Sequence, residues 1–216
     1  WLNKDSNGGD AISPIYEDGE VQYTYTRVET APNNYDPDDG PLRGESAECP
    51  HCDVVNEQKD VQQKLHDGEF EFSIYGVNYE TSTGERGYRA GSESDQRGME
   101  KAAERVDSDF NLLTFLSEPV DVSSRISDPS SYGMEEWRNI FTPRQLVVQY
   151  EFFLAFEEYK PEILAKYDEQ RADAILTVLS LAASRSMYYN SRLNQWHDLR
   201  GYGSHIFTDN NLSFKR

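Results

Sequence analysis

Apolar residues are unevenly distributed along this chain of 216 residues, and their distribution limits where a core can form. They concentrate between residues 110 and 189, whereas the rest of the chain is mostly charged and polar. A mean hydropathy of -0.80 and a hydrophobic content of 37% are low for a globular protein. We therefore expect a sizeable core only within residues 110–189.

The clearest local signal in the chain is a helix start at residues 141–146, which read F-T-P-R-Q-L. Thr142 suits the N-cap, Pro143 suits the first helical position, and Gln145 can complete a capping box. The Phe and Leu at the two ends of this segment form a hydrophobic staple around the cap. The pattern predicts a helix that runs to about residue 159 and ends at Lys160-Pro161.

Apolar residues occur nearly all round this predicted helix, which favours a buried position. A second helix is expected to begin after Asp168 and to run to about Tyr189. A stripe suited to close packing on the first helix runs along it, made of Ala172, Ile175, Leu179, Ala182 and Ser186.

The first ninety residues predict short strands separated by loops. Val21, Tyr23 and Tyr25 alternate with polar residues and indicate one strand. Residues 70–74 alternate in the same way, and a change of parity after them predicts a bulge at Gly76. Residues 92–106 then predict a polar helix with Ser92 as its cap and Asp95 in the capping box.

Cys49 and Cys52, separated by Pro50 and His51, are the only cysteines of the chain. Two thiolates at this spacing can reach one zinc ion from a tight turn, so the motif is typical of half a zinc knuckle. A structural site needs four ligands, and His66 does not follow at a standard spacing. A redox pair and an inert pair of thiols stay open as alternatives.

The last thirty-two residues carry five Lys or Arg and two Asp or Glu, whereas the whole chain has a net charge of -18. Such a segment favours a contact with a polyanion, through aromatic stacking and phosphate binding. The candidate contacts are Arg192, Trp196, His197, Arg200, Tyr202 and His205. The alternative is that the aromatic residues belong to a core and the arginines pair with carboxylates.

The acidic residues of the chain are scattered and outnumber the basic ones by 39 to 21. We interpret this balance as adaptation to high salt, because dispersed carboxylates keep a protein hydrated and soluble. The alternative is a negatively charged functional surface. The sequence has no apolar run of membrane-spanning length and no secretory signal, so we expect a cytoplasmic location without a membrane partner. It also lacks a glycine-rich phosphate loop, a G-x-S-x-G elbow and an H-E-x-x-H motif, and the residues themselves predict no catalytic centre.

Four segments, taken in order, resemble the large, zinc-ribbon-containing adenine-specific DNA methylases that begin with a conserved domain of unknown function. Trp1-Leu2 resembles the W-W-L that follows the first zinc knuckle of that family. Residues 49–52 resemble its second knuckle. The following G-Y-R and E-S-D, at 87–89 and 93–95, are similar to its G-Y-R-x-P-[TS]-x-x-D, although Ala90-Gly91 stands where the family has proline.

The other two segments lie in the second half of the chain. Residues 133–146 are similar to W-x-x-L-F-[ST]-P-R-Q-L-L. Residues 189–197, followed by Phe207, are similar to N-Y-N-S-R-L-x-x-W-H-x-x-R with its subsequent T-F motif. The S-adenosylmethionine loop of the family precedes this region and its (D/N)-P-P-(Y/F) motif follows it, and neither occurs here.

The resemblance implies the middle segment of a methyltransferase from a halophile that modifies adenine N6 within a restriction-modification system. S-adenosylmethionine would be the cofactor of the parent enzyme, and DNA and the remainder of that enzyme would be the partners. This segment alone should be inactive. Cys49 and Cys52 carry over as zinc ligands, and Arg192, Trp196, His197 and Arg200 are the expected DNA contacts. The alternative is a non-catalytic nucleic-acid-binding or scaffold protein.

We therefore expect an α+β fold with two parts. Residues 1–90 should form a small, zinc-ribbon-like β module. Residues 91–216 should form a mainly helical region with an irregular, basic C-terminal segment.

Overall fold

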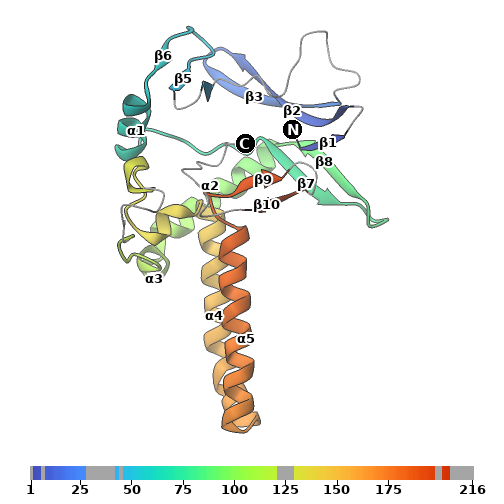
Figure 1. Ribbon diagram of the computed structural model, residues 1–216, viewed down its shortest axis with the longest axis vertical. Helices are drawn as coiled ribbons and strands as arrows, with labels where there is room; N and C mark the ends of the chain where they lie inside the picture. The colour runs from blue at the N-terminus through green and yellow to red at the C-terminus, as the bar shows by residue number, and fades with distance from the viewer. Residues whose placement is uncertain are drawn as a thin grey trace. The chain divides into compact units, whose positions relative to one another are not determined.

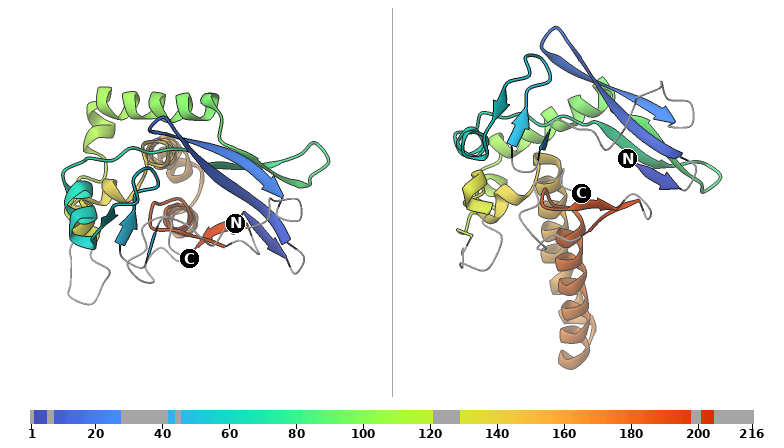
Figure 2. Two further views of the ribbon diagram at one scale, coloured as in Figure 1. Left: turned by 90° about the horizontal axis from the view of Figure 1, so that it is seen from above. Right: turned by 45° about the horizontal axis from the view of Figure 1, so that its top comes forward.

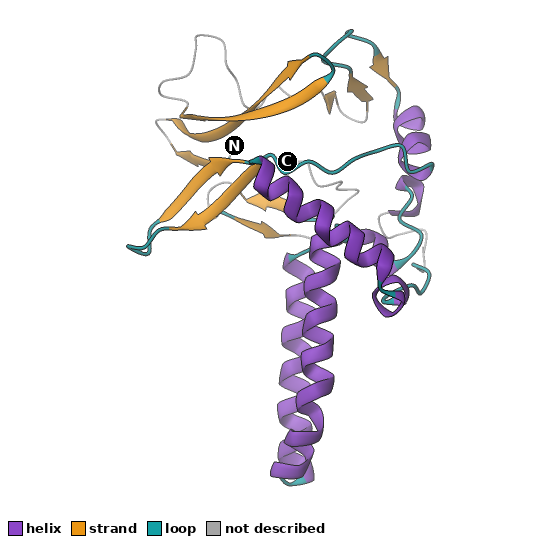
Figure 3. Ribbon diagram, turned by 180° about the vertical axis from the view of Figure 1, so that it is seen from behind, coloured by secondary structure: helices purple, strands orange, loops and turns teal. Residues whose placement is uncertain are grey.

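The computed structural model describes residues 2–5, 8–27, 42–43, 46–120, 129–197 and 201–204. Its contacts divide the chain into two compact units. Unit 1 consists of Trp1–Arg97, Ser130–Gly133 and Trp196–Tyr202, and unit 2 of Gly98–Pro129, Met134–Gln195 and Gly203–Arg216. Antiparallel sheets and long helices are both present, which confirms the α+β class (Figure 3).

The largest sheet of unit 1 is antiparallel, in the order β1-β2-β3. Its strands are β1 (Asn3–Asp5), β2 (Gly8–Glu17) and β3 (Glu20–Arg27) (Figure 1). Asp18 and Gly19 connect the two longer strands with positive φ at both positions, as a two-residue hairpin turn requires. The predicted alternation of Val21, Tyr23 and Tyr25 lies within β3, so this strand is confirmed.

A second antiparallel sheet of unit 1 carries the cysteines in the loop between its last two strands. Its order is β4-β5-β6, with β4 at Leu42–Arg43, β5 at Ser46–Glu48 and β6 at Val55–Asn56. Helix α1 (Gln58–His66) follows directly.

Strands β7 (Gly76–Glu80) and β8 (Arg86–Ala90) form an antiparallel ribbon in unit 1. The predicted strand at residues 70–74 is wrong, because this segment joins no ladder and the Phe72 carbonyl accepts a hydrogen bond from Gln96 Nε2 at 3.2 Å instead. The bulge at Gly76 is also wrong, since Gly76 is the first residue of a regular strand. A Cβ at this position would lie 3.3 Å from Ile12 and 3.4 Å from Leu2, so close packing explains the glycine.

Helix α2 (Glu93–Ser108) confirms the polar helix expected after Ser92. The Asp95 carboxylate accepts hydrogen bonds from the Ser92 backbone at 2.9 Å and from its hydroxyl at 2.6 Å. Shorter elements follow in the chain. They are α3 (Phe110–Thr114), η2 (Pro129–Tyr132) and η3 (Trp137–Ile140).

Helix α4 (Pro143–Lys166) begins as its sequence predicts. The Thr142 hydroxyl accepts from the Gln145 backbone, and the Thr142 backbone donates to Gln145 Oε1 at 2.9 Å, which completes the capping box. The predicted end at Lys160-Pro161 is wrong, because the helix continues through Pro161 to Lys166. Pro161 is exposed, and the turn that follows it supplies Ile163 and Tyr167 to the interface with the next helix.

Helix α5 (Glu169–Tyr189) begins after Asp168, whose side chain accepts from the Arg171 backbone, as the sequence predicts. Helices α4 and α5 lie side by side as an antiparallel hairpin within unit 2 (Figures 1 and 2). The expectation that α4 is buried all round is wrong, since Val148, Leu154 and Tyr159 are all exposed. Helix α4 packs on α5 along one face only, which leaves its other apolar residues outside the contact.

The buried apolar residues of the described chain lie mainly in unit 2. Ile140 and Phe141 precede α4, and Leu146 and Tyr150 occupy its first two turns. The remaining members are Leu2, Ala11, Val106, Leu112, Met134, Ala172 and Leu193. Within the part of the chain that the structure describes, no helix combines the length and apolar character needed to cross a membrane.

Candidate functional site

The two cysteines lie in a tight turn between β5 and β6. Cys49 directly follows β5, and its backbone N–H donates to the Val54 carbonyl at 2.8 Å. The Cys49 carbonyl accepts from the Asp53 backbone at 2.9 Å, which closes the turn around Cys52. Asp53 has a φ of 57°, a left-handed conformation that lets the chain reverse direction after Cys52.

Hydrogen bonds to the Cys49 sulfur favour its thiolate form. The backbone N–H of His51 makes the largest contribution, followed by the thiol and then the backbone N–H of Cys52. Together they hold the pKa of Cys49 below its usual value, although burial and the Asp53 carboxylate oppose this shift. Cys52 is exposed, and the two cysteines form no disulfide.

This arrangement fits two of the four ligands of a structural zinc ion. The thiols are adjacent, and backbone N–H groups stabilise negative charge on Cys49, which metal binding requires. His51 is directed elsewhere, because its ring packs edge-on against Tyr16 with centroids 5.7 Å apart. Among the described residues no group of three or more His, Cys, Asp or Glu side chains could hold a metal ion.

Arg192, a predicted DNA contact, anchors the chain that follows α5. Its backbone N–H donates to the Ile140 carbonyl at 2.7 Å, and its Nη1 donates to the Asn139 carbonyl at 2.9 Å. Burial lowers the pKa of Arg192 to about 10, which still leaves the guanidinium charged at neutral pH. Arg192 therefore binds the backbone of η3 within unit 2.

Trp196 and His197 lie in β9 (Gln195–His197), which pairs with β10 (Tyr202–Ser204). Trp196 Nε1 donates to the Leu2 carbonyl at 3.0 Å, so its polar edge is used within unit 1. The ring centroids of His197 and Tyr202 lie 5.8 Å apart. His197 Nδ1 is buried and has no hydrogen-bond partner among the described residues.

Gly201, the first described residue after β9, lies against the β7–β8 ribbon. Its N–H donates to the His197 carbonyl at 2.6 Å, and its carbonyl accepts from Asn78 Nδ2 at 3.5 Å. Its φ is 63°, and a Cβ there would meet the Arg86 guanidinium and lie 2.9 Å from the Tyr88 hydroxyl.

The structure thus brings Asn78, Arg86 and Tyr88 together around Gly201, a grouping that sequence reasoning missed. The period-two alternation of β7 and β8 places these three side chains on one face of the ribbon. This alternation is the sequence pattern that could have predicted the grouping. Of the predicted contacts, Trp196 and His197 belong to unit 1 and Arg192 to unit 2. Arg200 and His205 lie outside the described residues.

No family model, no curated protein and no solved structure matches this chain.

Proposed function

We propose that this chain is a non-catalytic, zinc-binding segment of an S-adenosylmethionine-dependent adenine DNA methyltransferase. The observation that carries the proposal is the turn at residues 49–52, which places the two thiols next to each other and directs backbone N–H groups at Cys49, so that its thiolate, the form that binds zinc, is favoured. The resemblance of residues 133–146 and 189–197 to segments of the zinc-ribbon methylases supports the choice of enzyme.

In this proposal Cys49 and Cys52 hold one side of the zinc ion, and two further thiolates come from elsewhere in the parent enzyme. Zinc with four protein ligands is structural and supplies folding energy rather than reaction chemistry. The N-cap of α4 and the hydrogen bonds of Arg192 would stabilise the fold of the segment. The methyl donor and the reacting adenine would bind to other parts of the parent.

The zinc claim is tested on the longest reading frame that contains this sequence. Metal analysis should find about one zinc per pair of C-x-x-C motifs, as four-coordinate structural sites require. Replacing Cys49 and Cys52 by Ser should remove that zinc and lower the melting temperature. His66→Ala is the matched control and should leave the zinc content unchanged.

The enzyme claim is tested by methyl transfer from labelled S-adenosylmethionine to adenine in DNA. The parent protein should be active and the 216-residue chain inactive. Binding of S-adenosylmethionine by the 216-residue chain would contradict the assignment. Reversible disulfide formation between Cys49 and Cys52 without bound metal would favour a redox function instead.

A further inference from the structure

The two flanks of α5 differ in chemical character. Ile175, Val178 and Ala182 follow one another at helical spacing and lie on one flank. The opposite flank has the same spacing but is polar, and its residues are Asp173, Thr177, Ser180 and Ser184. The Val178 residue is 64% exposed, so the apolar flank faces solvent in the described chain.

A groove of about 440 Å³ runs between α4 and α5 on this apolar flank. Leu179 lines it from α5, and α4 and its C-cap contribute four aromatic residues, two aliphatic residues and the charged residues Glu162 and Lys166. The large apolar lining residues of α4 and its C-cap are Phe152, Phe156, Tyr159, Ile163 and Tyr167. The Tyr159 residue is 54% exposed, although it contributes to this lining.

Few residues of the α4–α5 hairpin are fully buried. Its buried residues are Leu146, Gln149 and Tyr150 in the first two turns of α4, and Ala172 in α5. No other residue of the two helices is fully buried, so their apolar residues need a further layer. Exposed apolar residues beside a groove are typical of a surface that binds another protein.

The groove face is the side of the α4–α5 hairpin that carries this groove and the apolar flank of α5. Its size is similar to that of a dimer interface. The exposed and groove-lining apolar residues of α4 and its C-cap run from Val148 to Tyr167, a length of about 30 Å, and two helices side by side are roughly 20 Å wide. The resulting face of roughly 600 Å² is at the lower end of the range per partner for a standard protein interface. Two hairpins related by a two-fold axis would form a four-helix bundle.

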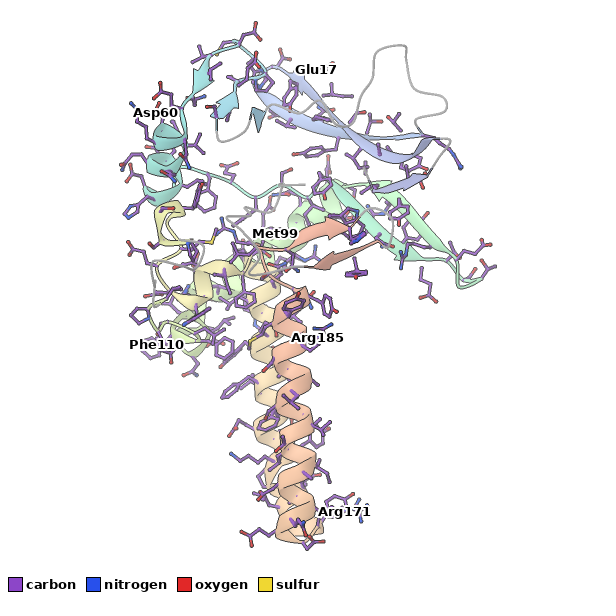
Figure 4. The ribbon with its side chains drawn as sticks, viewed as in Figure 1. Glu17, Asp60, Met99, Phe110, Arg171 and Arg185 are labelled. Atoms are coloured by element: carbon purple, nitrogen blue, oxygen red, sulfur yellow. The ribbon has the colours of Figure 1, made fainter. Side chains whose placement is uncertain are left out.

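Charge also favours a second copy at this position. Residues 143–189 contain five Lys or Arg and seven Asp or Glu, whereas the chain as a whole has a charge of -18. Arg171 and Arg185, near the two ends of α5, are held against the rings of Tyr167 and Tyr188, at 5.0 and 4.9 Å (Figure 4). The hairpin is therefore a nearly neutral surface on which two strongly acidic chains can approach each other.

We propose that the groove face of the α4–α5 hairpin is a homodimer interface, occupied by the same face of a second copy of this chain. The inference does not depend on the methyltransferase proposal. It predicts an association that strengthens with salt, because salt screens the repulsion between the acidic remainders of the two chains.

The test is sedimentation of the 216-residue chain over a wide range of concentration, in low salt and in about 1 M salt, where the Debye length is about 3 Å. The monomer mass is 24.8 kDa, and we expect a dimer in high salt that weakens in low salt. Val178→Asp should weaken the dimer by roughly a hundredfold or more, because it buries an unpaired charge. Ser180→Asp adds the same charge on the polar flank and should leave the dimer intact.

Circular dichroism checks that each variant keeps its helices. If Val178→Asp loses helicity, Val178→Thr replaces it, and a weaker dimer is still expected because Thr puts a hydroxyl at the contact. A wild-type chain that stays monomeric at every concentration and salt overturns the proposal, including the case in which another polypeptide fills the groove. An equal effect of the Val178 and Ser180 variants overturns it as well.

Discussion

Arg192 shows how one residue can carry a functional prediction and a structural role. Its half-buried side chain donates to the Asn139 carbonyl, and its backbone donates to Ile140. Arg192→Ala should lower the free energy of unfolding by about 1.5–3 kcal/mol, the range for hydrogen bonds that involve a charged group. Denaturant unfolding measures the loss, and Arg192→Lys should restore part of it. If Arg192→Ala weakens DNA binding with unchanged stability, the side chain acts as a contact rather than an anchor.

Gly201 is a position at which an added methyl group should be costly, because the backbone is left-handed and side chains approach it closely. Gly201→Ala places a Cβ against Arg86 and Tyr88 and keeps a left-handed backbone, so we expect a loss of more than about 1 kcal/mol in unfolding free energy. Gly19→Ala is the control, because Gly19 has a φ of 83° and open space around it. Thermal melts should show the smaller loss for Gly19→Ala, and equal losses would contradict the close approach at Gly201.

Asp95 makes the stability of unit 1 dependent on pH. Its carboxylate bonds Arg89 and then Ser92, and these bonds hold the pKa of Asp95 well below its usual range. A carboxylate with a lowered pKa in the folded state stabilises above its unfolded pKa of about 3.9, and this stabilisation is lost as the pH falls. The Arg89 side chain is 44% exposed, so solvent screens the ion pair and its contribution to the free energy of unfolding is small. Asp95→Asn should flatten the acid limb of the stability curve, whereas Glu93→Gln should leave it unchanged.

At the scale of elements, local chemistry predicted both ends of α5 and the start of α4, but not the end of α4. Thr142 and Gln145 determine the start of α4 through hydrogen bonds between close neighbours, so the sequence contains all that is needed. Pro161 lies inside α4, and the turn after it contributes Ile163 and Tyr167 to the groove that Leu179 of α5 also lines, a tertiary arrangement that is not visible in a sequence. The segment at 70–74 has the alternation of a strand but does not join a β-ladder with any described strand.

The cysteine turn of the candidate site could be predicted from local sequence, whereas the contacts of Arg192 and Trp196 could not. A four-residue turn sets the spacing of Cys49 and Cys52, and their adjacency could be predicted. Arg192 and Trp196 bond to the distant residues Asn139 and Leu2, which no local pattern reveals.

The N-cap of α4 offers a direct measurement at this scale. Thr142→Ala should cost about 1 kcal/mol, because the Gln145 backbone N–H loses its acceptor at the helix start. Thr142→Ser keeps the hydroxyl and should retain most of the stability. Urea denaturation compares the two variants, and an equal loss in both would mean that the Thr methyl group, rather than the cap, is responsible.

For the whole molecule, the net charge of -18 follows from composition alone. Most buried apolar residues lie within residues 110–189, as the distribution of apolar residues predicted, but Leu2, Ala11, Val106 and Leu193 lie outside that range. The division into units could not be judged in the same way. Segments distant in sequence, such as Ser130–Gly133 and Trp196–Tyr202, join the first ninety-seven residues only through tertiary contacts.

Pro161 has a consequence for how the protein opens. It has no N–H to donate to the Glu157 carbonyl, so α4 lacks one backbone hydrogen bond close to its C-terminal end, far from its buried first turns. Amide protons after Pro161 should therefore exchange with solvent faster than those at residues 146–156, by local fraying that leaves the remainder folded. Mass spectrometry of deuterium uptake can resolve the two halves of α4. Uptake after Pro161 that slows as the protein concentration rises would show that a second molecule protects the frayed end.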